Sequence, residues 1–243
     1  MCKRVLLKIS GEALKSGKEA LSVRKLDFIT DVIKDLYEEH YEIVVIVGAG
    51  NISRGTFGQK WGVSSADADV NGMLATIVNV GWITSILEKK INRQSVRKMI
   101  TIPSSYCGEA YSMEKAKSYL TKGKIVLIGG GTGASLCTTD TAAIQRAVEL
   151  EVDRVIMLKN GADGVFTEDP KKNHRAKRYK SISFVDFKKL GAGIIDEVAS
   201  INACRHKVPM HFISFREAKK IASICKGKKN IGTFVGEVPT ELY

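Results

Sequence analysis

The chain has 243 residues, of which 44% are hydrophobic and 26% are charged. These fractions are ordinary for a globular protein, and by a prior of roughly 150 residues per domain the length allows one large domain or two small ones. The 38 Lys and Arg residues outnumber the 26 Asp and Glu residues, so the formal net charge is +12. A basic surface suits anionic partners such as nucleotides, nucleic acid or lipid headgroups, although a basic proteome would produce the same balance.

The five cysteines are scattered along the chain and form no Cys-x-x-Cys pair. This pattern argues against a disulfide framework or a zinc ribbon and favours a reducing compartment. No signal peptide precedes the first strand-like run, and no apolar run approaches the ~18 residues that a membrane span needs. We therefore expect a cytoplasmic protein that does not cross a membrane.

Short runs rich in Val, Ile and Leu alternate with longer helical patterns along the chain. Strands so predicted cover residues 4–10, 42–48, 98–103, 124–130, 154–158, 210–215 and 232–236. Helices are predicted around 29–36 and at 70–90, 113–122, 139–150, 196–207 and 216–226. Nearly continuous apolar strands are typical of strands that are covered on both faces. The alternation predicts an α/β fold, a three-layer α/β/α sandwich with a mostly parallel central sheet.

In such folds ligands gather at the carboxyl ends of the strands, so the loops that leave the strands are the candidates for chemistry. The first of these loops is "KISGE", Lys8 to Glu12. A lysine beside a glycine turn can hold a phosphate by charge while backbone N–H groups bind its oxygens. Taken alone, an outward-facing strand lysine explains the loop better, and the spacing that follows does not match a Walker A motif.

The second loop is "GAGNISRG", Gly48 to Gly55. Its glycines allow a close backbone approach, and the planar guanidinium of Arg54 matches phosphate oxygens. Ser53 stands where a dinucleotide fingerprint has its third glycine. A strand-to-helix turn with a surface arginine remains the alternative interpretation.

The third loop, "IGGGTGASLCTTD", runs from Ile128 to Asp140 and matches Gly-x-Gly-x-x-Ala. A dinucleotide site also needs an acid at the end of the next strand, but that strand is followed by Lys159 and Asn160, which disfavours a nicotinamide dehydrogenase. Four hydroxyl side chains instead lead into the N-terminus of a helix. Such an arrangement suits a polar, planar or anionic ligand better than it suits a plain structural turn.

The fourth loop is "KNGADGVFTEDP", Lys159 to Pro170, with turn signals on either side of a short predicted strand, "VF". Phe166 either packs on a nucleotide base or belongs to a plain hairpin. The four histidines lack metal-binding spacing. The basic run at 171–180 is more typical of a solvated loop than of a nucleic-acid site.

Taken together, these loops resemble those of the bacterial UMP kinases, which are members of the amino acid kinase family, over essentially the whole chain. The segments that carry the resemblance are "KISGEAL", "GAGNISRG", "DVNGMLAT", "GTGASLCTTD", "DGVFTEDP" and "GTFV". The resemblance implies a single amino acid kinase domain over residues 1–243. Its N-terminal part would bind mainly UMP and phosphate, and its C-terminal part, from about residue 150, mainly ATP.

Individual roles follow from the resemblance, residue by residue. Catalytic roles fall to Lys8, Arg54 and Asp140, and Asp196 matches a further polar site residue. The expected ATP contacts are Lys8, Ile9, Ser10, Gly11, Gly50, Arg54, Asn160, Phe166 and Asp169. The expected UMP contacts are Ala49, Asp69, Thr132, Gly133, Ala134, Ser135, Leu136, Cys137, Thr138 and Thr139. The resemblance implies no metal site made by the protein, because Mg²⁺ accompanies ATP, and it implies a homohexamer built from dimers.

The expected activity is reversible phosphoryl transfer from ATP to UMP, giving UDP and ADP in pyrimidine nucleotide biosynthesis. Within the same fold, a carboxylate or carbamate kinase is the alternative, and Asp69 argues against it because a carboxylate suits ribose hydroxyls. Asp69 could equally be an ordinary helix N-cap. From another class, a nucleic-acid-binding regulator would use the +12 charge, and its binding would fall steeply with salt; we do not expect nucleic acid to be a partner.

Overall fold

The computed structural model describes residues 2–53, 60–102, 104–170, 172–190, 193–228 and 230–243. The described residues form one ten-stranded sheet in the order β10-β7-β9-β8-β6-β1-β2-β5-β3-β4. The strands are β1 (Arg4–Ile9), β2 (Glu42–Val47), β3 (Val96–Ile100), β4 (Glu109–Ala110), β5 (Ile125–Gly129), β6 (Arg154–Lys159), β7 (Tyr179–Ser183), β8 (Met210–Ser214), β9 (Thr233–Gly236) and β10 (Glu241–Leu242).

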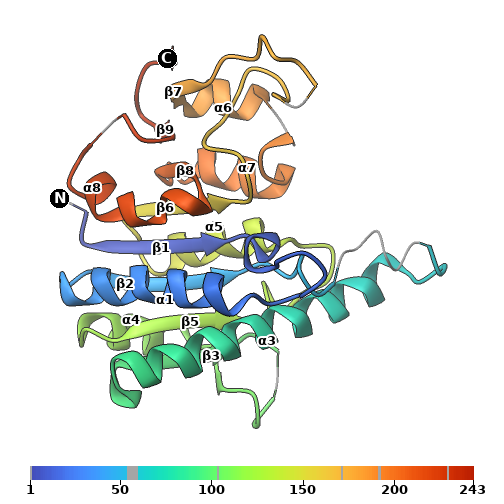
Figure 1. Ribbon diagram of the computed structural model, residues 1–243, viewed down its shortest axis with the longest axis vertical. Coiled ribbons are helices and arrows are strands. Elements are labelled where there is room, and N and C mark those ends of the chain that lie inside the picture. Colours follow the sequence, from blue (N-terminus) through green and yellow to red (C-terminus); the bar gives the residue numbers. More distant parts are fainter. Residues whose placement is uncertain (1, 54–59, 103, 171, 191–192, 229) are drawn as a thin grey trace.

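Helices cover both faces of this sheet (Figure 1). One face packs against α1 (Val23–Glu38), α3 (Ser65–Lys90) and α8 (Ile221–Cys225). The opposite face packs against α4 (Met113–Thr121), α5 (Thr139–Glu149), α6 (Phe184–Leu190) and α7 (Glu197–Arg205). The prediction of a three-layer α/β/α sandwich is confirmed.

Strand direction brings the site loops to one edge of the sheet. Neighbouring strands are parallel except for the pairs β10–β7 and β8–β9. At the centre, Lys8 of β1 pairs in register with Ile46 of β2 and Met157 of β6. Because these strands run in the same direction, the loops that follow them meet at the same end.

The continuous apolar strands have the expected physical cause. Along β1, Leu7 and Ile9 pack on the face covered by α1, whereas Leu6 packs on the face covered by α5. All three side chains are fully buried. Since alternate residues of a strand point to opposite faces, covering both faces removes the polar half of the usual alternation.

Several boundaries differ from the sequence predictions. α3 begins at Ser65 rather than at residue 70, because the hydroxyl of Ser64 caps it by accepting the N–H of Asp67 at 3.1 Å. The predicted helix at 216–226 is a 3₁₀ helix, Phe215–Lys220, followed by α8. The predicted strand "VF" is reduced to one bridge between Phe166 and Arg178. β4, β7, β10 and α6 were not predicted.

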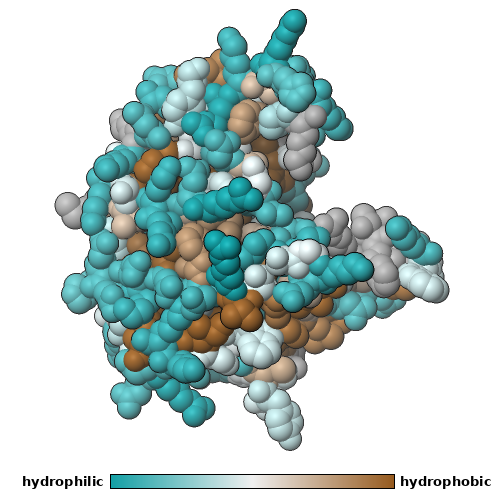
Figure 2. Space-filling model, in the orientation of Figure 1, coloured by the Kyte–Doolittle hydropathy of each residue, from teal (hydrophilic) through white to brown (hydrophobic). Residues whose placement is uncertain are grey.

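Apolar side chains also line the outer side of α3. Val70, Leu74, Val78 and Trp82 follow one another at intervals of one helical turn, and each is between 44% and 53% exposed. Figure 2 shows hydrophobic surface along this helix. Among the described residues, α3 is also the one helix whose length and composition would allow it to cross a membrane, a weak criterion that core helices of soluble proteins meet as well.

Candidate active site

The loops after β1, β2 and β5 touch one another at the carboxyl edge of the sheet. A Cβ atom on Gly11 would lie 2.4 Å from the carbonyl oxygen of Gly48, which no side chain tolerates. A Cβ atom on Gly48 would lie 3.3 Å from the hydroxyl oxygen of Thr139. The glycines therefore allow these loops to approach one another closely, as the sequence predicted for the second loop.

A largely buried charge cluster lies beside these glycines. Lys8 is 6% exposed, and its Nζ lies 2.6 Å from Oδ1 of Asp140 in the first turn of α5. Lys159, the last residue of β6, places its Nζ 3.4 Å from Oδ2 of the same carboxylate. Lys159 also donates a hydrogen bond to the carbonyl of Ile194 at 2.8 Å. One carboxylate thus holds two ammonium groups in place.

Burial and charge act in opposite directions on these groups. Burial alone would raise the pKa of Asp140, but the neighbouring charges of Lys8 and Lys159 hold that pKa below the ordinary aspartate value. Burial lowers the pKa of Lys159, and the charge of Asp140 offsets this only in part. Asp140 is therefore ionised at neutral pH. Two ammonium groups fixed by it can neutralise the oxygens of a transferring phosphoryl group.

The glycine-rich loop after β5 needs its glycines for its own turn. Gly130, Gly131 and Gly133 have φ angles of +90°, +63° and +86°, which side chains rarely adopt. Thr76 of α3 fixes this turn because its hydroxyl accepts the N–H of Gly130 at 2.8 Å. A structural turn thus explains much of this glycine cluster.

Asp69 connects α3 to this loop. Its Oδ2 accepts the N–H of Leu136 at 2.7 Å, and Leu136 itself has a φ angle of +64°. The N-cap interpretation of Asp69 is wrong, because Ser64 caps α3 and Asp69 lies inside the helix. A second link runs from the hydroxyl of Ser135 to the carbonyl of Ala66, at 3.3 Å.

Some hydroxyls of the loop have structural partners. Thr138 caps α5 by accepting the N–H groups of Asp140 and Thr141, and its hydroxyl donates to Asp196 at 2.5 Å. Asp196 in turn caps α7 through the N–H of Ala199 at 2.9 Å. The pair therefore joins α5 to α7. The hydroxyl of Thr132 bonds locally to the backbone of Ala134 at 3.1 Å.

The remaining predicted site residues lie on the same loops or on the hairpin that follows β6. Ile9 has a fully buried side chain, so only its backbone faces the loops, and its carbonyl accepts the N–H of Gly48 at 2.8 Å. The N–H of Ser10 donates to the carbonyl of Leu158 at 3.0 Å. Arg54 lies outside the described residues. Ala49, Gly50 and Cys137 are partly buried, whereas Gly133 and Ala134 are exposed.

The hairpin after β6 is attached to β7 and β9. Asp163 forms an ion pair with Arg178, and the N–H of Val165 donates to the hydroxyl of Thr233 at 2.9 Å. Phe166 is partly exposed on this hairpin, while Asn160 and Asp169 are exposed. The structure therefore fixes the hairpin that carries these three predicted ATP contacts.

A pair of amides near the site was missed in the sequence. Asn79 of α3 is fully buried, and its Nδ2 donates to the carbonyl of Gly48 and to Oδ1 of Asn51, both at 2.8 Å. Asn51 donates back to Oδ1 of Asn79 at 2.9 Å. The available signal was a pair of polar residues, Thr76 and Asn79, three positions apart in the otherwise apolar stretch 73–83 of this helix. Lys159 was also missed as a partner of Asp140.

Replacement of Asn79 by leucine is expected to lower the free energy of unfolding by about 1–3 kcal/mol, because it leaves the carbonyl of Gly48 and the amide of Asn51 without their partner. Urea denaturation measures this change. The matched control is Asn71→Leu on the exposed side of the same helix, which is expected to change stability by no more than about 0.5 kcal/mol. Equal losses in the two variants would contradict the role of the amide pair.

Comparison with known proteins identifies a family and a similar protein for this chain. The model of the amino acid kinase family matches residues 3–214. A uridylate kinase from Rickettsia bellii is 37% identical over 223 residues, which cover 91% of this chain and 92% of the relative.

Solved structures agree with this relationship. The UMP kinase of Bacillus anthracis superposes with a TM-score of 0.94 at 34% identity, covering 100% of this chain and 99% of that one. The UMP kinase of Ureaplasma parvum superposes with a TM-score of 0.87 at 26% identity, covering 98% of this chain and 100% of that one. With the fold, the glycine loops and the family model in agreement over most of its length, the chain belongs to the amino acid kinase family.

Proposed function

We propose that this chain transfers the terminal phosphoryl group of ATP to UMP, giving UDP and ADP. The observation that carries the proposal is the Lys8–Asp140–Lys159 cluster, which lies largely buried where the glycine loops meet. Phosphoryl transfer requires two anions to approach in line, so positioning and charge neutralisation supply most of the catalysis. The names of the relatives, uridylate kinase and UMP kinase, support UMP as the acceptor.

In this proposal the two substrates lie over different parts of the single domain. The phosphates of ATP lie against Lys8, Ser10, Gly11 and Gly50, together with the backbone of Ile9 and with Arg54. The base and ribose of ATP lie on the side of Asn160, Phe166 and Asp169. UMP occupies the space between Ala49, Asp69 and the segment 132–139, so the two phosphates meet near the charge cluster.

Mg²⁺ is proposed to enter with ATP. No group of three or more His, Cys, Asp or Glu side chains in a metal-binding arrangement occurs within the described residues. Asp140 already holds two lysines, and Asp196 accepts from Thr138, Thr141 and Ala199. These side chains fit an ion whose ligands are mainly substrate phosphates and water molecules, as is usual for Mg²⁺. When bound, it would neutralise phosphate charge.

We also propose a cytoplasmic homohexamer that works in pyrimidine nucleotide biosynthesis. The five free cysteines suit a reducing compartment. The apolar row on α3, Val70, Leu74, Val78 and Trp82, offers a surface for a second copy of the chain. Light scattering tests this assembly, and the mass of a single 26.6 kDa chain would contradict it.

A coupled assay of ADP release, with UMP, CMP, AMP and carbamate as separate acceptors, tests the activity. UMP is expected to be the preferred acceptor. Activity with carbamate alone would overturn the proposal in favour of the carbamate kinase alternative. Tight, sequence-specific nucleic-acid binding that persists at high salt would require an additional role, because binding by net charge alone falls steeply with salt.

Replacement of Asp69 by asparagine is expected to weaken UMP binding by about 10- to 150-fold, because a neutral amide replaces a charged acceptor of the ribose hydroxyls. The amide oxygen still accepts the N–H of Leu136, so the fold is expected to be retained. Isothermal titration calorimetry with UMP measures the effect.

The 2′-deoxy substrate provides the control for this role of Asp69. The wild-type protein is expected to discriminate against dUMP, and the Asp69→Asn variant to discriminate less. If the variant binds UMP normally and still rejects dUMP to the same degree, Asp69 only fixes the loop at Leu136.

A further inference from the structure

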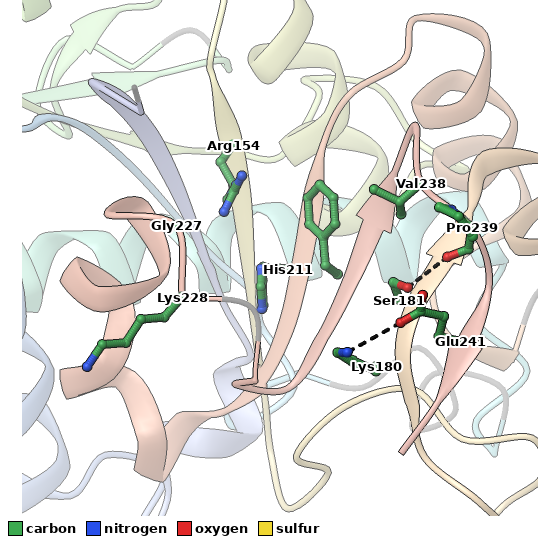
Figure 3. A pocket seen from close by; sticks show the side chains of 10 residues that line it. Arg154, Lys180, Ser181, His211, Gly227, Lys228, Val238, Pro239 and Glu241 are labelled. Carbon is green, nitrogen blue, oxygen red and sulfur yellow. Dashed lines mark hydrogen bonds and ion pairs between the residues drawn. The ribbon is translucent and has the colours of Figure 1, made fainter.

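A cavity lies at the other end of β6 from the charge cluster. Arg154, which lines it, begins β6, and Lys159 ends that strand. The two residues are therefore about 16 Å apart along the strand. The cavity has a volume of about 300 Å³, which is within the range of small-molecule sites. Figure 3 shows it from close by.

The floor of this cavity is a row of side chains on three neighbouring strands. His211 of β8 pairs in register with Phe234 of β9, and Phe234 pairs with Ser181 of β7. Residues paired in this way point to the same face of a sheet. The rings of His211 and Phe234 lie 5.7 Å apart. Val238 and Pro239 add an apolar wall, so a planar apolar group of a ligand can pack inside the cavity.

Two polar atoms at one end of the cavity lack hydrogen-bond partners. The guanidinium of Arg154 lies over the ring of Phe234 at 4.9 Å and donates to the carbonyl of Ile224 at 3.1 Å, but its Nε has no partner. His211 is 1% exposed; its Nε2 bonds to the carbonyl of Ile231, and its Nδ1 has no partner. Buried polar groups normally form hydrogen bonds. The two nitrogens without partners therefore indicate that a hydrogen-bonding ligand can bind at this end of the cavity.

The charge of the lining favours an anion. The lining contains three cationic side chains, Arg154, Lys180 and Lys228, and one carboxylate, Glu241, which pairs with Lys180 at 3.3 Å. The surplus of positive charge matches a phosphate monoester, which carries about −1.5 to −2 charges at pH 7. The planar fork of an arginine is well suited to phosphate oxygens.

We propose that this cavity binds a phosphate monoester whose flat apolar group packs beside Phe234 and against Val238 and Pro239, and whose phosphate is held by Arg154, with Lys228 adding positive charge at the rim. The site is separate from the catalytic cluster, and the inference does not depend on the proposed kinase activity. Binding there would be detectable with neither ATP nor UMP present.

Calorimetric titration with phenyl phosphate, in the absence of nucleotides, tests the site. Arg154→Met keeps an apolar side chain over Phe234 and is expected to weaken binding by about tenfold or more. Lys228→Met removes an exposed charge at the rim and is expected to weaken binding by about two- to fivefold. The control is Lys219→Met, an exposed lysine that does not line the cavity, and its binding is expected to equal that of the wild type.

The NMR resonances of the His211 ring locate the binding. They are expected to shift on titration of the wild type with phenyl phosphate, and to shift much less with phenol, which lacks the phosphate. Unchanged His211 resonances, or equal weakening by Lys219→Met and Lys228→Met, would overturn the site. Near-UV circular dichroism checks that Arg154→Met is folded; if it is not, Lys228→Met and the His211 resonances decide the question.

Discussion

Replacement of Lys8 by methionine is expected to lower kcat by about 100- to 1000-fold, the usual cost of removing one group that stabilises developing charge. The dissociation constant of UMP is expected to change by less than about threefold, because the contact with Lys8 strengthens only as charge moves in the transition state. Methionine nearly matches the buried stem of lysine, so the packing of β1 is retained. Steady-state kinetics and calorimetric titration with UMP measure the two effects separately.

The control for this prediction is Lys34→Met. Lys34 lies on α1 and pairs with Glu38 at 2.6 Å, and its replacement is expected to leave kcat unchanged. A loss of UMP affinity in Lys8→Met as large as its loss of kcat would show that Lys8 binds the acceptor rather than the transferring group.

Replacement of Asp140 by asparagine is expected to lower kcat by about 100-fold or more and to lower the free energy of unfolding by about 3 kcal/mol. The substitution leaves Lys8 and Lys159 close together without the carboxylate between them. Their mutual repulsion then displaces both ammonium groups. Kinetics and urea denaturation measure the two losses, and Asp35→Asn on the exposed side of α1 is the matched control.

The pH dependence of stability gives an independent test of Asp140. Its folded-state pKa is lower than the ordinary value of 3.8, so the ionised carboxylate stabilises the fold above that value. This contribution is lost as the pH falls through the folded-state pKa. The wild type is therefore expected to lose more stability than Asp140→Asn between pH 4 and lower pH, measured by urea denaturation at each pH. Parallel curves for the two proteins would contradict the ion-pair assignment.

The sequence predicted the layered fold well because strands covered on both faces leave a strong signal. In β2 every residue is buried, and five of the six are Ile or Val. β7 gave no such signal, since only Ile182 of its five residues is buried. The two-residue strands β4 and β10 are too short to show any periodicity. The N-terminus of α3 was missed because its first residues are small and polar.

The residues of the site could be predicted from the sequence only where a single short segment contains the whole motif. Each glycine loop is a local signal, and their meeting at one edge follows from parallel strands. The pairing of Lys159 with Asp140 joins residues 19 apart, and that of Asn51 with Asn79 joins residues 28 apart. Such pairs depend on strand register and helix rotation, which no short motif specifies. The contact of Asp69 with Leu136 depends likewise on where α3 begins.

The two ends of the sheet restrict how copies of the chain can associate. β4 and β10, the outermost strands of the described sheet, contain only two residues each. Long exposed edge strands act as templates for aggregation because their free backbone groups pair with another chain. Strands this short offer little template, which disfavours fibril growth by strand addition at both ends. Contacts between copies through side chains are favoured instead, and single substitutions can tune or abolish such contacts.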